Sequence, residues 1–474
     1  MQSEKVITPP SWLIVLLHFS SLFGIFQLFS FMGYGVTFVD FFLSILYLII
    51  FKQFFFDNRK FLIMDRTVLL PIILLLFAVV FSGIGLLFWA GRESYIQFLK
   101  TISHFTFVAL YGIVAISIEI NYKTVFKILK IFLYSSIIIN LYAIYQLIAR
   151  IYFLPLAYLD ITNISFQTRD FDREVGEYTQ VVLNFENFYR ATSIFSEPSA
   201  LAWFNIYCLV IILIPLLTRN KLFIQKRWLL YSTLSLAVIG LFLTFSLTGM
   251  LLLFFLIFSI IVFERIKMLK MLIVTFAVIL IVATTDLIQM NFTNVSIAEL
   301  FYSRISGLVS DTNRGNKMTV GESAPDRIQS IQNAINLFLD FPVTGIGSGN
   351  TYYYPKSTKR FTQSSFFHLL AETGIIGASA FLFLAFYFIR IIFYLNKYRY
   401  KFIETMPELA TLQSFAIYLT LIVFFSNILI GSAVGNYGFW LEIGLILIIY
   451  RQTIKYLEQS NQASQGNNIN FSAQ

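Results

Sequence analysis

Long apolar runs, separated by shorter polar and charged segments, fill most of this chain. A helix that crosses a bilayer needs about 20 mostly apolar residues. Twelve runs approach this length: residues 12–31, 36–56, 67–89, 95–118, 126–150, 196–218, 228–246, 248–264, 270–288, 365–395, 410–431 and 434–450. The pattern predicts an all-α polytopic membrane protein with about 12 transmembrane helices. Two connections are long, at about residues 150–195 and 289–364.

The seventh and eighth runs form one stretch that is too long for one span and short for two. We predict a break at residues 246–249. With that break, every short loop on one side carries several Lys or Arg, which the positive-inside rule assigns to the cytoplasm. Merging the two runs would move the basic loops 265–270 and 390–401 outside. The charges therefore favour twelve spans, two long outer loops and two cytoplasmic termini.

Composition agrees with this reading. The chain of 474 residues is 58% hydrophobic and 12% charged, whereas soluble domains have about 25% charged residues. This excludes a soluble enzyme, a disordered chain and a nucleic-acid partner, and the net charge of +9 reflects orientation in the membrane. One cysteine, Cys208, and three histidines offer neither an intrachain disulfide nor a zinc cluster. We predict one integral membrane domain, 1–458, and a disordered cytoplasmic tail, 459–474.

Basic residues also gather in the two long outer loops. Most are arginines, whose guanidinium suits bidentate contact with phosphate or carboxylate. Acids in the same loops could pair with them instead, and the sequence leaves both readings open. The set comprises Arg150, Arg169, Arg173, Arg190, Arg304, Arg314, Lys317, Arg327, Lys356, Lys359 and Arg360.

The second loop contains a helix signal. Residues 323–326 resemble a capped start, and Ile328, Ile331, Ile335 and Phe338 recur at helical spacing before residues 340–342 stop the helix. We predict an amphipathic helix at the membrane interface, whose N-terminal end, with Arg327, suits an anion. A purely structural lid helix is the alternative.

A flexible turn is expected at residues 345–349, which are rich in glycine but form neither a Walker loop nor a dinucleotide fingerprint. Tyr352 begins a run of three tyrosines followed by cations. Such a group suits a sugar or a lipid headgroup, although an interfacial aromatic belt is the favoured reading.

Three acidic features are candidates for chemistry. Glu197 stands at the outer end of a span and suits a general base, or a salt bridge to Arg190. His368 and Glu372 are four residues apart within a span and can share a helix face, for function or for packing. Residues 170–172 have Asp-x-Asp spacing, a weak metal signal.

Local motifs in this order resemble the bacterial O-antigen and capsule repeat-unit polymerases of the Wzy type, and more distantly the O-antigen ligases. The resemblance covers the whole layout of spans and loops. The motifs are residues 195–200 (FSEPSA), 244–246 (TFS), the Arg327 helix ending at 342–347 (PVTGIG) and 370–377 (LAETGIIG).

The resemblance implies a glycosyltransferase with GT-C-like architecture in the bacterial inner (plasma) membrane, active on its periplasmic or extracellular face. Its substrate would be oligosaccharide repeat units on undecaprenyl pyrophosphate, polymerised without metal or other cofactor. Besides the bilayer, a chain-length regulator and a flippase are expected partners. On this reading Glu197 and Arg327 are catalytic. Arg327, Arg190 and Arg360, then Arg304 and Arg314, bind pyrophosphate, and His368, Glu372 and Tyr352 line the substrate cavity.

Two departures bear on the choice within the family. Ligases usually carry a His where Gln363 stands and tend to carry an Arg where Leu247 stands. Both differences favour a polymerase. A ligase that transfers glycan to lipid A-core remains the alternative, as does a flippase for lipid-linked oligosaccharides, whose cations should line a path through many spans.

Overall fold

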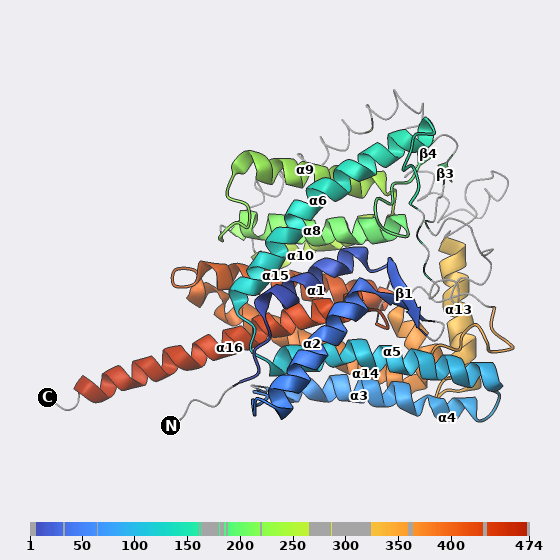
Figure 1. Ribbon diagram of the computed structural model, residues 1–474, viewed down its shortest axis with the longest axis horizontal. Helices are drawn as coiled ribbons and strands as arrows, with labels where there is room; N and C mark the ends of the chain where they lie inside the picture. The colour runs from blue at the N-terminus through green and yellow to red at the C-terminus, as the bar shows by residue number, and fades with distance from the viewer. Residues whose placement is uncertain are drawn as a thin grey trace. The chain divides into compact units, whose positions relative to one another are not determined.

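The computed structural model describes residues 6–31, 34–63, 65–159, 188–218, 220–264, 324–358, 364–429 and 434–471, together with residues 161, 163, 180, 184–185 and 286. The chain divides into two compact units. The first holds Met1–Val15, Ile45–Phe126 and Ser330–Gln474, and the second holds Leu16–Ser44 and Lys127–Gln329. Both are built mainly of helices (Figure 1).

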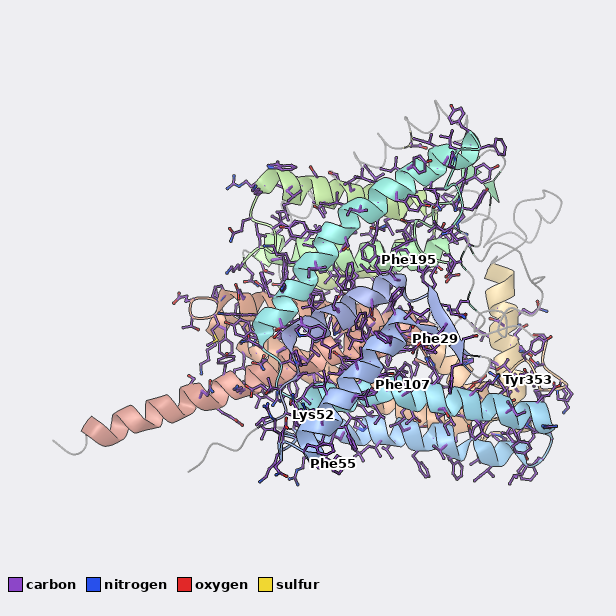
Figure 2. All side chains as sticks on the ribbon, in the orientation of Figure 1. Phe29, Lys52, Phe55, Phe107, Phe195 and Tyr353 are labelled. Atoms are coloured by element: carbon purple, nitrogen blue, oxygen red, sulfur yellow. The ribbon has the colours of Figure 1, made fainter. Side chains whose placement is uncertain are left out.

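The first unit is a bundle of long apolar helices. α14 packs against α3 and α15, and α16 packs against α5 and α15. Tyr47 of α2 donates a hydrogen bond to the carbonyl of Phe107 in α5 at 2.7 Å. Figure 2 labels Phe107, together with Lys52 and Phe55 near the C-terminal end of α2. The helices are α2 (Phe38–Phe55, from Ile45 on), η2 (Arg66–Val68), α3 (Leu69–Phe81), α4 (Gly83–Leu86), α5 (Arg92–Ser117), α13 (Ala324–Asp340, from Ser330 on), α14 (Ser365–Tyr398), η4 (Arg399–Phe402), α15 (Pro407–Leu429) and α16 (Tyr437–Phe471).

One carboxylate joins three helices of this bundle. Oδ2 of Asp65 accepts hydrogen bonds from the hydroxyls of Tyr387 in α14, at 2.8 Å, and Tyr450 in α16, at 2.9 Å. Oδ1 accepts from Thr67 in η2, directly before α3, through its backbone N–H at 3.0 Å and its hydroxyl at 2.6 Å. Burial raises the pKa of Asp65, but these hydrogen bonds outweigh it and hold the pKa below its usual value.

The second unit combines helices with two small hairpins. Strands β1 (Gln27–Phe31) and β2 (Tyr34–Thr37) are antiparallel, as are β3 (Asn184–Phe185) and β4 (Phe188–Tyr189). α8 packs against α9 and α10. The side chain of Asn140 in α6 donates to that of Asn205 in α8 at 2.9 Å. The helices are α1 (Ser11–Ser20, from Leu16 on), η1 (Ser21–Phe23), α6 (Tyr122–Ile151, from Lys127 on), α8 (Pro198–Thr218), α9 (Arg227–Leu243) and α10 (Leu247–Glu264).

Eight helices among the described residues are long and apolar enough to cross a membrane: Phe38–Phe55, Arg66–Leu86, Arg92–Ser117, Tyr122–Ile151, Pro198–Thr218, Leu247–Glu264, Ser365–Phe402 and Pro407–Leu429. Two shorter apolar helices are Ser11–Phe23 and Arg227–Leu243. Each coincides with a predicted span, so the chain is a mostly helical, multi-pass membrane protein. Nearly all of the predicted span 270–288 lies outside the described residues, and the total of twelve stays a prediction.

Three boundaries differ from the sequence expectation. The first run is helical only to Phe23, and its remainder forms β1. The break between the seventh and eighth runs lies at Thr244–Ser246, slightly earlier than predicted, with Phe245 at a φ of 49°. α16 continues to Phe471 and so includes most of the segment for which composition predicts disorder.

Candidate functional site

Helix α14 is broken about two and a half turns from its start. Gly374 has a φ of 64° and a ψ of −161°, outside the helical region. The freed backbone groups find partners in the segment that follows α13. The N–H groups of Ile346 and Gly347 donate to the carbonyls of residues 371 and 372 at 3.1 and 3.0 Å, and Ile375 N–H donates to the carbonyl of Pro342 at 2.9 Å. Such replacement partners make a broken helix tolerable in a membrane protein.

Residues Gly345–Gly349, here called the glycine loop, fit tightly against this break. Gly345, Gly347 and Gly349 all have positive φ, which glycine adopts at little cost. A Cβ atom on Gly345 would stand 2.4 Å from the carbonyl oxygen of Glu372. The sequence predicted a flexible turn, whereas the loop is held by hydrogen bonds because its glycines let the backbone approach α14.

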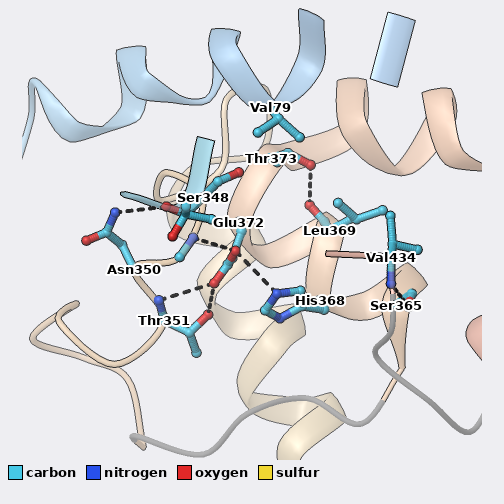
Figure 3. A network of polar contacts seen from close by, with 12 residues as sticks. Val79, Ser348, Asn350, Thr351, Ser365, His368, Leu369, Glu372, Thr373 and Val434 are labelled. Carbon is cyan, nitrogen blue, oxygen red and sulfur yellow. Dashed lines mark hydrogen bonds and ion pairs between the residues drawn. The ribbon is translucent and has the colours of Figure 1, made fainter. Parts of the chain in front are cut away.

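The carboxylate of Glu372 is enclosed by the same segment (Figure 3). Oε2 accepts a hydrogen bond from the backbone N–H of Gly349 at 2.7 Å. Oε1 accepts from the hydroxyl of Thr351 at 2.7 Å and from its N–H at 3.4 Å. Glu372 is buried, and these donors compensate the loss of water around its charge. The arrangement makes Glu372 a fixed anchor for residues 349–351.

His368 completes the contacts of this carboxylate. Its Nε2 atom lies 3.3 Å from Oε2 of Glu372, one helical turn away (Figure 3). Its Nδ1 atom is buried and has no hydrogen-bond partner among the described residues. An ionised Glu372 accepts from Nε2–H, which in a neutral imidazole leaves Nδ1 as an acceptor. The predicted pairing of His368 and Glu372 is therefore present.

The glycine loop is also tied to the end of the α3–α4 segment. Ser348 N–H donates to the hydroxyl oxygen of Ser82 at 3.1 Å. The indole N–H of Trp89 donates to the carbonyl of Ile346 at 3.2 Å. These two bonds fix the loop against a second span as well as against α14.

Helix α13 forms where the sequence predicted it. Its buried side chains are Ser330, Asn333, Ala334 and Leu337. Ala334 and Leu337 join Ile346, Tyr354 and Ala371 in a hydrophobic cluster, with Trp89, Phe341 and Phe367 packed against it. Arg327 belongs to the first turn of α13, but its side chain lies outside the described part of the chain.

The C-terminal end of α13 carries an ion pair. Asp340 accepts from the ammonium of Lys356 at 3.0 Å and from the hydroxyl of Tyr354 at 2.8 Å. These bonds hold the pKa of Asp340 below its usual value, and burial together with Asp340 raises the pKa of Tyr354 to about 12. Tyr354 is buried with its ring edge-on to Trp89, 5.0 Å between centroids, so it does not belong to an aromatic belt. Tyr352 is partly buried.

In the second unit, Arg150 organises the segment that precedes α8. Its side chain is buried, and its guanidinium donates to the carbonyl of Ala157 at 3.0 Å, to the hydroxyl of Thr192 at 2.8 Å and to the carbonyl of Arg190. It also stacks over the ring of Tyr158, 4.9 Å from the centroid. Arg150 thus serves as a structural cation.

Sequence reasoning missed Gln146, one turn before Arg150. Its Oε1 atom accepts from the backbone N–H groups of Thr192 and Ser193 at 3.2 and 2.7 Å. The signal was present: Gln146 and Arg150 are two polar residues four apart in the mostly apolar last three turns of α6, where polar groups need partners.

Arg190 and Glu197 both lie in the second unit. Arg190 is buried, and its Nε–H donates to the carbonyl of Thr244 at 2.9 Å. Glu197 is partly buried and directly precedes α8, whose residue Ala200 donates its N–H to the Glu197 carbonyl at 3.2 Å.

The remaining predicted site residues are not described. Arg304, Arg314 and Arg360 lie outside the described ranges, as do residues 170–172. Among the described candidates, His368 and Glu372 are brought into contact.

A comparison with known protein families covers this site. A family model described as O-antigen ligase matches residues 232–382, about a third of the chain. The matched part includes α9, except its first residues, α10, α13, the glycine loop and the His368–Glu372 pair. A search of curated proteins found no match. Members of this family are glycosyltransferase-like enzymes acting on polysaccharides, which supports an enzymatic role at this coarse level. The match supports placing the chain in the O-antigen ligase and polymerase superfamily.

Proposed function

We propose that the chain polymerises undecaprenyl-pyrophosphate-linked oligosaccharide repeat units into O-antigen or capsular polysaccharide. The observation that carries the proposal is the family match, because it encloses the buried polar cluster around Glu372. The reaction takes place on the outer face of the bacterial plasma membrane, with both termini in the cytoplasm. A flippase supplies the substrate, and a chain-length regulator assists.

The reaction is a glycosyl transfer. A hydroxyl of the acceptor sugar attacks the anomeric carbon of the growing chain, a new C–O bond forms, and the bond to the lipid pyrophosphate breaks. The hydroxyl proton passes to a base, and the pyrophosphate leaves with its negative charge increased. Cations beside that charge lower the barrier, and holding both lipids in register removes much of the entropic cost. No metal is required.

Each candidate residue has a part in this proposal. Glu197 is the base. Arg327 and Arg360 bind the pyrophosphate, with Arg304 and Arg314 in support. Arg190, whose Nε–H donates to the carbonyl of Thr244, also belongs to the pyrophosphate site. His368, Glu372 and Tyr352 line the substrate cavity, where Glu372 also fixes residues 349–351.

The second candidate function is ligation of a finished glycan to lipid A-core. The description of the matching family favours it. Gln363 and Leu247, at the positions where ligases usually carry His and Arg, favour the polymerase.

An assay in nanodiscs distinguishes the two functions. The purified protein is given the cognate undecaprenyl-pyrophosphate repeat unit, with or without lipid A-core and with or without EDTA. A ladder of longer glycans that EDTA leaves intact supports the polymerase, whereas transfer to lipid A-core alone supports the ligase. The ladder should disappear in Arg327→Ala and Glu197→Gln and persist in Arg92→Ala, which removes an exposed cation elsewhere.

A folded wild-type preparation that elongates nothing and transfers nothing would contradict both glycosyl-transfer functions. Flipping of the lipid-linked substrate would then be the function to test.

A further inference from the structure

The structure assigns helix α13 to the surface of the bilayer. The side chains of Ile335 and Leu339 would be immersed among the acyl chains of the leaflet at the Leu86 end of the candidate span Arg66–Leu86. These two apolar residues are 38% and 66% exposed. They lie about 40° apart around the helix axis, since successive residues advance by about 100°. The partner we infer for this face is lipid.

The opposite face of α13 is the one that packs against the protein. Asn333 and Leu337 are both buried, and each lies about 160° from Ile335 on the helix. Leu337 contributes to the hydrophobic cluster with Ile346 and Ala371. The exposed apolar stripe is therefore not a strip of core left open, because the helix already has a packed face.

The level of α13 relative to the spans follows from the glycine loop. The loop is hydrogen-bonded to Ser82 and Trp89, at the end of the candidate span Arg66–Leu86. Its other contacts are with the break in α14 at Gly374. The part of α14 after the break, residues 375–398, has 24 residues and is about 36 Å long at about 1.5 Å per residue. It can therefore cross the hydrocarbon core, which is about 30 Å thick, by itself. The segment before Gly374 therefore fits outside the core, and the loop lies near the boundary.

The exposed apolar surface continues from α13 onto the end of that span. Val343, three residues after the helix, is 54% exposed, and Leu87 and Phe88, directly after the span, are both 71% exposed. The ring of Phe88 lies 6.1 Å from that of Phe341, between centroids. Apolar surface residues at the end of a membrane span face lipid. Because Leu339 belongs to the same apolar surface, we infer that it faces lipid as well.

The direction of α13 agrees with this placement. Figure 1 shows α13 running across α3 and α5 rather than along them. A helix that crosses the direction of the spans lies along the membrane plane, which is the position of interfacial amphipathic helices.

Fluorescence quenching tests the assignment without any substrate. In a Cys208→Ala background, an environment-sensitive dye is attached to Ile335→Cys, Leu339→Cys or Asn336→Cys, and each protein is placed in nanodiscs. Asn336 is the matched control because it is also exposed but lies about 100° from Ile335. We expect doxyl groups on acyl chains to quench positions 335 and 339 several-fold more than 336, and aqueous iodide to show the reverse order.

Equal quenching at the three positions would overturn the assignment. So would protection of positions 335 and 339 from both quenchers, which would indicate a protein partner. If iodide reaches positions 335 and 339 and loses that access only when a polyprenyl-pyrophosphate lipid is added, the face would be a groove for the tail of the substrate and not a surface for bilayer lipid. Size-exclusion profiles confirm folding of each variant. The outcome is independent of the glycosyl-transfer assay, so failure of one proposal is distinguishable from failure of the other.

Discussion

The backbone N–H of Gly349 donates a hydrogen bond to Oε2 of Glu372 at 2.7 Å, across 23 residues of sequence. This bond connects the segment that follows α13 with the break in α14. Together with the bonds from Thr351, it makes the carboxylate of Glu372 the anchor of the glycine loop. A change at either partner should therefore affect the whole connection.

Glu372→Gln should destabilise the protein. The amide NH2 group cannot accept a hydrogen bond, so at least one buried donor from Gly349, Thr351 or His368 loses its partner. A buried unsatisfied polar group costs about 1–3 kcal/mol. Thermal unfolding of the purified protein in detergent measures the loss.

Thr351→Val should reproduce part of this effect, because it removes the hydroxyl that donates to Oε1 of Glu372. Thr351→Ser is the matched control, since it keeps the hydroxyl and should leave the melting temperature near that of the wild type. Equal melting temperatures for the valine and serine variants would contradict the anchoring role.

Gly345→Ala should be strongly destabilising. The added Cβ atom would meet the backbone of Glu372 at 2.3–2.4 Å, and the residue would also need a positive φ of 69°. Gly438→Ala is the control, because nothing lies within 4 Å of its added Cβ and alanine favours helices by about 1 kcal/mol. A melting temperature that falls for both variants alike would argue against the close approach.

Arg150→Met should unfold the segment before α8 more readily. Methionine fills a similar volume but leaves the carbonyls of Ala157 and Arg190 and the hydroxyl of Thr192 without this donor, at about 1–3 kcal/mol for each group that stays buried. Limited proteolysis between residues 151 and 197 measures local opening. Arg92→Met, at an exposed position, should cleave like the wild type.

Tyr450→Phe should lower stability near neutral pH and matter less in acid. The pKa of Asp65 is held below its unfolded value of about 3.9, so its bonds stabilise the fold above that pH. Their contribution is lost as the pH falls through the folded pKa. The difference in melting temperature between wild type and variant should therefore narrow as the pH falls below about 3.9.

Tyr231→Phe controls for loss of a tyrosine hydroxyl, because Tyr231 is exposed on α9. It should follow the wild type throughout the titration. A gap for Tyr450→Phe that persists unchanged until acid itself unfolds the protein would show that the hydroxyl acts independently of the Asp65 charge.

The sequence by itself determined the features that depend on local patterns. Apolar runs of span length located helices such as Pro198–Thr218 and Pro407–Leu429, because transfer into hydrocarbon is decided by composition over about 20 residues. Helical spacing of apolar residues likewise located α13. The spacing of His368 and Glu372 predicted that they share a helix face, and they are in contact.

Only the tertiary structure decided how polar groups far apart in the chain pair with one another. The donors from Gly349 and Thr351 to Glu372, the bonds of Arg150 and the tyrosines around Asp65 depend on long-range packing, which leaves no local period in the sequence. The sequence predicted that α13 is amphipathic, but it did not show which apolar side chains pack on protein and which face lipid. A helix can pack one face on protein while it presents another to lipid. Hydropathy measures transfer out of water, and it is the same for both destinations.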